Sequence, residues 1–322
     1  MSEETLHTYE KFRDACKNGD LATVEELFPL VLDRDERHQG LFEAARNGRL
    51  PVVDFLIPWT DTKAAGSLAL RWAAAQGHTE VVERLTPKSN PNDVGHEALC
   101  ASAELGRLDV VRVLLPLAED EGKARALKAA SKAGQLIVVE FILPSVPKHL
   151  IDYSALFWAS SGGHVEIIKR LLPVSKLSPD EPLKNPLVAA AQGGHIDAVK
   201  ILASRIDPRM DMSAALLAAA KNGHAKIVEY LIPLSSPYDD KSAALYSAVA
   251  HSHIDVIDIL YKKSDTSAVL EKVRYRGIDT RGVMHLKNLV DIQSQKEFLR
   301  KNTKTLKDNK KSVSKSSIKK KM

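Results

Sequence analysis

The chain has 322 residues, of which 44% are apolar, 5% aromatic and 27% charged, as is typical of a soluble globular protein. No run of about 18 apolar residues occurs, so no membrane span is predicted. The acidic, polar start MSEETLHTYEKF is unlike a secretory signal, and the two cysteines, Cys16 and Cys100, form no CxxC motif. We therefore expect a cytoplasmic protein in a reducing compartment.

Positive charge is concentrated at the C-terminus. The last 27 residues, 296–322, contain 11 Lys and Arg against 2 acidic residues, a net charge of +9. Because the whole chain carries +5, residues 1–295 carry about −4. The high isoelectric point therefore belongs to the tail, and the rest of the chain is mildly acidic.

A glycine recurs every 28 to 31 residues along most of the chain. We call it the marker glycine, and a serine replaces it in a ninth copy. The nine marker positions are Gly19, Gly48, Gly77, Gly106, Gly134, Gly163, Gly194, Gly223 and Ser252. Such regular spacing indicates an array of repeated structural units.

The third copy illustrates what each repeated column predicts. Leu70 and Ala73 before the marker are typical of one face of a short first helix, and Gly77 suits a helix end that needs a left-handed residue. Val82 and Leu85 form the buried stripe of a second helix, which proline ends in seven copies. We predict two helices and a loop of about a dozen residues per copy, stacked into a solenoid.

Phrases such as AAAQGHTEVVERL, ASSGGHVEIIKRLL and AAAKNGHAKIVEYL resemble the ankyrin repeat. The resemblance covers about residues 8–264 and implies an all-α, ankyrin-like helical-hairpin solenoid of about nine repeats, spanning residues 1–264. The period is shorter than the usual repeat of about 33 residues. The Thr-Pro-Leu-His opening of that family is missing, and Leu-x-Pro replaces its Gly-Ala-Asp turn. We therefore expect the β-hairpin fingers of the family to be shortened or lost.

The repeat pattern weakens toward the C-terminus. SAVLEKVRYRG is interpreted as a degenerate tenth first helix ending at Gly277, and the following HLKNLVDIQSQKEFLRKN as a C-terminal capping helix, together residues 265–302. Residues 303–322 are rich in Lys, Ser and Asn with few apolar side chains, which predicts a disordered basic tail.

Five histidines, His78, His164, His195, His224 and His253, directly follow marker positions. A shared zinc ion is excluded, because its ligands must lie about 2 Å from one ion, whereas equivalent positions in a solenoid are roughly 10 Å apart. The resemblance instead implies hydrogen bonds from the ring to nearby backbone.

The cysteines and tryptophans allow two interpretations each. Cys16 and Cys100 are interpreted as buried side chains, because a nucleophile needs a histidine base and a lowered pKa, although His38 and His96 are in reach of the two thiols by position. Trp72 and Trp158 share the column five residues before the marker. They either fill space between repeats, which we favour, or anchor a partner.

The concave helix face is where the resemblance implies that a partner binds. The candidate partner-binding residues are Lys17, Arg46, Trp72, Gln76, Glu104, Lys132, Trp158, Gln192, Lys221 and Asn222.

We expect a monomeric scaffold that binds a protein partner, has no cofactor and is not an enzyme, because no phosphate loop, HExxH or GxSxG motif occurs in a fitting context. Alternatives are a host-directed effector or viral adaptor, acting in a host cell, and an adaptor in the nucleus whose basic tail contacts nucleic acid or an acidic surface. A catalytic role for residues 265–322 is disfavoured, because so short a segment rarely builds an active site.

Overall fold

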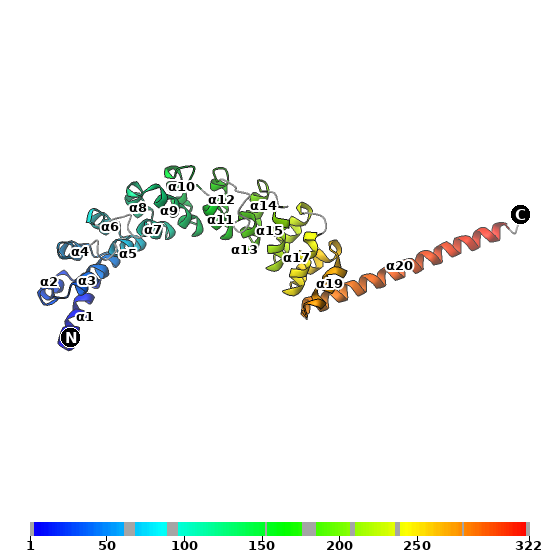
Figure 1. The fold of residues 1–322 in the computed structure, drawn as a ribbon, viewed down its shortest axis with the longest axis horizontal. Coiled ribbons are helices and arrows are strands. Elements are labelled where there is room, and N and C mark those ends of the chain that lie inside the picture. Colours follow the sequence, from blue (N-terminus) through cyan, green and yellow to red (C-terminus); the bar gives the residue numbers. More distant parts are fainter. Residues whose placement is uncertain are drawn as a thin grey trace. The chain divides into compact units, whose positions relative to one another are not determined.

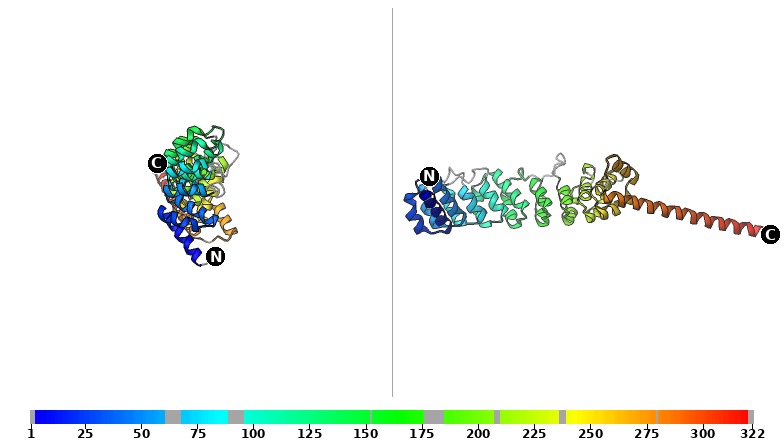
Figure 2. Two further views of the ribbon diagram at one scale, coloured as in Figure 1. Left: turned by 90° about the vertical axis from the view of Figure 1, so that its left-hand side faces the viewer. Right: turned by 90° about the horizontal axis from the view of Figure 1, so that it is seen from below.

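The computed structural model describes residues 3–60, 68–88, 96–151, 153–175, 185–206, 210–235, 239–278 and 280–319. Within these ranges it contains 20 α-helices and no strand, which confirms the predicted all-α fold (Figure 1). The helices form two compact units, Met1–Ala189 and Ala190–Met322. Within each unit, consecutive helical hairpins lie side by side (Figure 2).

Nine hairpins account for the helices α1 to α18. The first helices are α1 Glu3–Asn18, α3 Arg34–Arg46, α5 Leu68–Gln76, α7 Glu97–Glu104, α9 Asp120–Lys132, α11 Tyr153–Ser161, α13 Pro186–Gly193, α15 Met210–Lys221 and α17 Asp239–Ala250. The second helices are α2 Leu21–Leu27, α4 Leu50–Leu56, α6 Thr79–Leu85, α8 Leu108–Leu114, α10 Leu136–Ile142, α12 Val165–Leu171, α14 Ile196–Ala203, α16 Ala225–Leu231 and α18 Ile254–Leu260.

The marker positions adopt the left-handed backbone conformation that the sequence predicted. The eight marker glycines have φ between +69° and +89°, and Ser252 has φ +60°. The residue after each marker closes the first helix with a backbone hydrogen bond to the carbonyl five residues earlier, as from His78 N to Ala73 O at 3.0 Å. This is the bond pattern of a Schellman helix end, so each turn is built from a local signal in the sequence.

The predicted core columns are buried in every copy, with one exception. In the fourth copy, Leu99 and Leu114 are each 1% exposed and Val111 is 0% exposed. The exception is Leu27 of the first copy, which is only half-buried because no earlier hairpin covers it. Phe28 beside it is buried and makes an edge-to-face contact with Phe55, with ring centroids 5.3 Å apart.

The predicted loops of about a dozen residues are wrong wherever the structure describes the whole junction. The second helix is followed at once by a 3₁₀ turn, such as Phe28–Leu30 or Leu115–Leu117, with proline in its first residues. The next first helix then begins after residues 31–33 or 118–119. At the first of these junctions, the Asp33 carboxylate accepts from the Asp35 N–H at 2.7 Å and thereby starts the helix early. These connections are too short for a β-hairpin finger.

The C-terminal part of the second unit continues the array. Helix α19, Thr266–Tyr275, is followed by Gly277 with φ +63°, and Ile278 N donates to Val273 O at 3.1 Å, so it closes in the same way as the nine earlier first helices. Helix α20, Arg281–Lys319, starts where Thr280 Oγ1 donates to Val249 O at 2.8 Å. It packs against α17, α18 and α19 and so occupies the place of a second helix.

Helix α20 is longer than the sequence predicted. Its backbone remains helical through residues 303–319, where a disordered tail was predicted. Lysine is a good helix former, and the segment after Gly282 contains neither glycine nor proline to end the helix. A division of the C-terminal region at residue 302 therefore remains a proposal, based on charge and not on secondary structure.

Candidate partner-binding face

The candidate binding residues lie at the C-terminal ends of the first helices. Trp72 and Trp158 are half-buried. The other eight are exposed: Lys17, Arg46, Gln76, Glu104, Lys132, Gln192, Lys221 and Asn222. We call the surface made by these ten residues the first-helix face. Its part in the first unit extends from Lys17 to Trp158, and its part in the second unit contains the last three residues of the list.

In seven copies, the residue after the marker joins neighbouring copies at this face. His78 Nε2 lies 3.1 Å from Arg46 O, and His164 Nε2 lies 3.2 Å from Lys132 O. Because a carbonyl oxygen only accepts, Nε2 must carry the proton in each pair. Each histidine of the pair therefore donates to the last turn of the first helix in the preceding copy.

The same bond is made in other copies by two further histidines and by arginine or glutamine. The remaining contacts are Arg49 Nε to Lys17 O at 3.0 Å, Arg107 Nε to Ala75 O at 3.2 Å, Gln135 Nε2 to Glu104 O at 3.3 Å, His224 Nε2 to Gln192 O at 2.9 Å and His253 Nε2 to Lys221 O at 2.9 Å. The predicted structural role of the histidine column is confirmed at these positions. No cluster of three or more His, Cys, Asp or Glu side chains suited to a metal ion occurs within the ranges that the structure describes.

Trp72 is covered by a cation from the preceding copy. The guanidinium carbon of Arg46 lies 5.1 Å from the centroid of the Trp72 ring, within the range of a cation–π interaction. Phe42, one turn before Arg46 on α3, packs edge-to-face on the same indole, with centroids 6.1 Å apart. Three side chains from two copies thus form one cluster on the first-helix face.

The cation–tryptophan pair recurs three copies later, although its phenylalanine comes from the helix of the tryptophan and not from that of the cation. Lys132 Nζ lies 5.1 Å from the centroid of the Trp158 ring, and Phe157 packs edge-to-face on that ring at 5.4 Å. In both clusters the cation lies two residues before its marker, and the tryptophan is 26 residues further along the chain. The repeated spacing of 26 residues is a signal in the sequence that could have predicted this pairing, but the residues were named separately and the spacing was not used.

Arg46 and Lys132 are each held at two points by the following copy. The backbone carbonyl accepts from a histidine, and the side-chain cation rests on a tryptophan of the same copy. Neither cation has a carboxylate partner among the described residues. By contrast, Arg71 of α5 is paired with Glu97 at 2.6 Å.

Arginines on the second helices form ion pairs with acidic residues of neighbouring copies. Arg84 pairs with Asp54 at 2.8 Å, and Arg170 pairs with Glu140 at 2.8 Å, each pair joining consecutive second helices. These exposed pairs contribute little to stability, but they neutralise the side chains that a partner would otherwise meet. Unpaired positive charge in the first unit is therefore better placed on the first-helix face.

Both thiols have environments opposite to that of a nucleophile. Burial raises the pKa of Cys16 to about 12, and burial also raises the pKa of Cys100, where the charge of Arg125 partly opposes the rise. The His96 ring is buried against Gly122 of α9, where an added Cβ would clash with it. Cys16 is buried as interpreted, whereas Cys100 is only half-buried. The pKa directions agree with neutral thiols at both positions.

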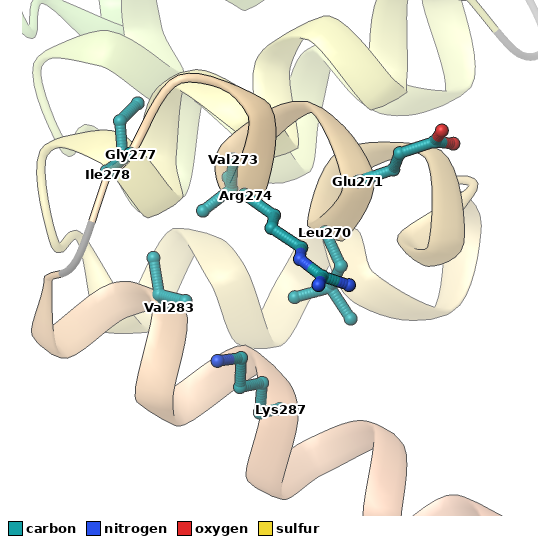
Figure 3. A pocket seen from close by; sticks show the side chains of 8 residues that line it. All are labelled: Leu270, Glu271, Val273, Arg274, Gly277, Ile278, Val283 and Lys287. Atoms are coloured by element: carbon teal, nitrogen blue, oxygen red, sulfur yellow. The ribbon is translucent and has the colours of Figure 1, made fainter.

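An open groove of about 830 Å³ lies between α19 and α20. Arg274 and Lys287 extend into the space between the two helices, whereas Glu271 points away (Figure 3). The remaining lining is mostly apolar: Leu270, Val273, Gly277, Ile278 and Val283. The sequence did not predict this groove, because it depends on the angle at which the last two helices pack.

No helix in the described part of the chain is both long and apolar enough to span a membrane.

Comparison with known proteins places the hairpins in a family. The family model described as "Ankyrin repeats (3 copies)" matches residues 12–93, 41–125, 70–153, 126–213 and 207–269. The crystal structure of the human ASB11 ankyrin repeat domain is similar to part of the chain, with 23% sequence identity and a TM-score of 0.43. That match covers 55% of this chain and 96% of the other. A search of curated proteins found no match.

The five matches to the family model together span residues 12–269, which is well over half of the 322 residues. They agree with the helical hairpins, the glycine turns and the buried columns of the structure. The chain therefore belongs to the ankyrin-repeat family.

Proposed function

We propose that the chain is a scaffold that binds a protein partner through the first-helix face and the adjoining inter-repeat loops, without chemistry of its own. Ankyrin repeats are generally protein-interaction modules. The observation that carries the proposal is the exposure of at least one polar or charged side chain of this face in seven of the nine copies, next to columns that are buried with the single exception of Leu27. Such a surface can vary without cost to the fold, and it is continuous over adjacent copies.

The candidate residues differ in how free their side chains are to contact a partner. Asn222 donates from its side chain to Ala218 O at 2.8 Å and so caps its own helix, which limits its availability to a partner. Gln76 and Glu104 have no comparable contact among the described residues and project from α5 and α7. We therefore place the centre of the binding surface in the first unit.

Affinity purification with the full chain tests this location. Gln76→Arg combined with Glu104→Arg changes only exposed side chains of the first-helix face. The matched control is Ile137→Arg, which changes an exposed residue of the second helix α10, where the side chain is 67% exposed. We expect the double variant to lose partners that the wild type and the control retain. Equal retention by all three proteins would contradict the proposal.

A second contact, through the basic segment 296–322, is proposed on the basis of its net charge of +9. A lysine cluster attracts phosphates and other polyanions in a salt-dependent manner. It would add a nucleic-acid or acidic-surface contact to the scaffold. An adaptor that acts in the nucleus or in a host cell would use the same two surfaces, and the purification tells these settings apart by the partner it recovers.

A further inference from the structure

Building on the proposed function, we infer that the segment bound by the first unit is an extended, acidic polypeptide, and that Arg46 and Lys132 are its two anchors. The inference rests on the two clusters Phe42/Arg46/Trp72 and Lys132/Phe157/Trp158. They are the two places in the described first unit where a cation of the first-helix face lies on a tryptophan ring.

Each anchor is preorganised for a carboxylate. A guanidinium has five N–H donors and an ammonium three, so a cation on the face of an indole keeps donors that do not face the ring and can bind an incoming acid. The histidine bond to the backbone carbonyl fixes the start of the same side chain, at 3.1 Å for Arg46 and 3.2 Å for Lys132. Less conformational entropy is therefore lost when a carboxylate binds than at an unrestrained surface cation.

The tryptophans also favour a strong ion pair between each anchor and a bound carboxylate. Both indoles are half-buried, so they offer apolar surface directly beside the charge. A partner that covers the indole removes water from the ion pair and strengthens its charge-assisted hydrogen bonds. Tryptophan and arginine are also the residue types that most often dominate binding energies at protein interfaces.

The distance between the anchors sets the length of the bound segment. Arg46 and Lys132 belong to copies three apart, and helices that pack side by side are roughly 10 Å apart, which gives a separation of about 30 Å. An extended chain advances about 3.3 Å per residue. The two acidic positions of the partner should therefore be about nine residues apart.

The face between the anchors favours a different residue type. Glu104 is exposed there, and Leu105 beside it is 50% exposed. A carboxylate of the partner would be repelled by Glu104, whereas an apolar side chain can cover Leu105. We expect the centre of the segment to be apolar and uncharged, which separates it from a uniformly acidic tract.

A nucleic acid fits this surface less well. Phosphates follow each other closely along a strand, whereas the two anchors are about three helix spacings apart with Glu104 between them. Residues 1–295 also carry a net charge of about −4, which disfavours a long polyanion. The observations therefore favour a peptide with separated acids.

Two synthetic peptides of identical composition test the inference on the full chain. The spaced peptide has two glutamate pairs about nine residues apart, a central leucine, and Ser and Gly elsewhere. The clustered peptide contains the same residues with its glutamates contiguous. The protein carries Trp59→Phe, which leaves Trp72 and Trp158 as the only indoles, so that fluorescence emission and acrylamide quenching report directly on the two clusters.

We expect the spaced peptide to change the emission and to bind at least about tenfold more tightly than the clustered one. Arg46→Gln and Lys132→Gln should each weaken its binding by about tenfold or more. Lys128→Gln is the matched control. Lys128 is an exposed cation one turn before Lys132 on α9, and it is not part of the first-helix face. This variant should bind like the wild type.

Three outcomes would overturn the inference. They are equal affinity for both peptides, an equal loss in Lys128→Gln, and no tryptophan response to the spaced peptide. Circular dichroism melts confirm that the variants are folded. Suppose that a partner fails to bind the Gln76/Glu104 double variant and still binds Arg46→Gln and Lys132→Gln as it binds the wild type. That result would support the proposed function and reject the acidic segment.

Discussion

The imidazole of His78 fills the space that a side chain on Gly48 would need. A Cβ added to Gly48 would lie 2.6 Å from His78 Nδ1, and Gly48 itself has φ +71°. Glycine is thus required twice at this position, once by its backbone conformation and once by the ring from the next copy. Gly223 and His253 show the same relationship, again at 2.6 Å.

Gly48→Ala should therefore destabilise the first unit by about 2–4 kcal/mol, because left-handed strain and steric overlap add together. Gly277→Ala separates the two causes, since Gly277 has φ +63° but nothing within 4 Å of its added Cβ. It should cost only about 1–2 kcal/mol. Urea unfolding followed by circular dichroism measures both values, and equal losses would show that the His78 contact is unimportant.

The hydrogen bond between copies can be tested at His164. His164→Ala removes the donor to Lys132 O and should cost about 0.5–1.5 kcal/mol. His164→Gln should recover most of this loss, because Gln135 donates from the same column to Glu104 O at 3.3 Å. If glutamine and alanine reduce the free energy of unfolding equally, the bond does not contribute to stability.

Val111→Asp should unfold several copies together. Val111 is 0% exposed in α8, and an unpaired carboxylate there costs several kcal/mol, on the order of the stability of a small domain. Coupling between neighbouring copies should spread the unfolding. Hydrogen exchange is expected to accelerate well beyond the substituted hairpin, whereas faster exchange restricted to residues 106–116 would show that the copies unfold independently.

Cys16 should resist alkylation in the folded protein. Its pKa is raised from the ordinary value of 9.0 to about 12, chiefly by burial, so the neutral thiol is the form that folding favours. The resulting stabilisation is complete below pH 9.0 and is lost as the pH rises toward about 12. Iodoacetamide at pH 8 should label Cys16 only after unfolding, and rapid labelling of the native chain would contradict this pKa direction.

Truncation after Lys301 should leave the melting temperature nearly unchanged. The contacts that dock α20 are near its start, where Val283 is 3% and Leu286 0% exposed, whereas every residue from 291 to 301 is exposed. Retention on heparin should fall because most of the +9 charge is removed. A melting point several degrees lower, or unchanged retention, would show that the basic segment is not a separate module.

The repeat, the turns and the core were predictable because each depends on a local pattern. A glycine in a fixed place predicts a left-handed helix end, and Val111 with Leu114 predicts a buried stripe, whatever the neighbouring copy contains. The early start of α3 was missed because it depends on the Asp33 cap in a segment interpreted as loop. The helix through residues 303–319 was missed because low hydrophobicity was weighted above helix propensity.

The candidate site was predicted as a set of residues but not as an arrangement. Arg46 and Trp72 were named separately, since their contact crosses from one copy to the next and requires the packing of α3 on α5. The groove between α19 and α20 lay beyond prediction for a related reason, because the degenerate tenth copy breaks the period that positions all earlier helices.

The most direct test of the central claim is site-specific photocrosslinking from the two faces of the first unit. A photoreactive phenylalanine analogue replaces Gln76 on the first-helix face or Ile137 on the second-helix side, both exposed in the structure. Illumination in cells, followed by mass spectrometry, identifies what each probe touches. We predict that the probe at position 76 captures a defined protein and that the probe at position 137 does not. Capture of the same partner only from position 137 would contradict binding through the first-helix face.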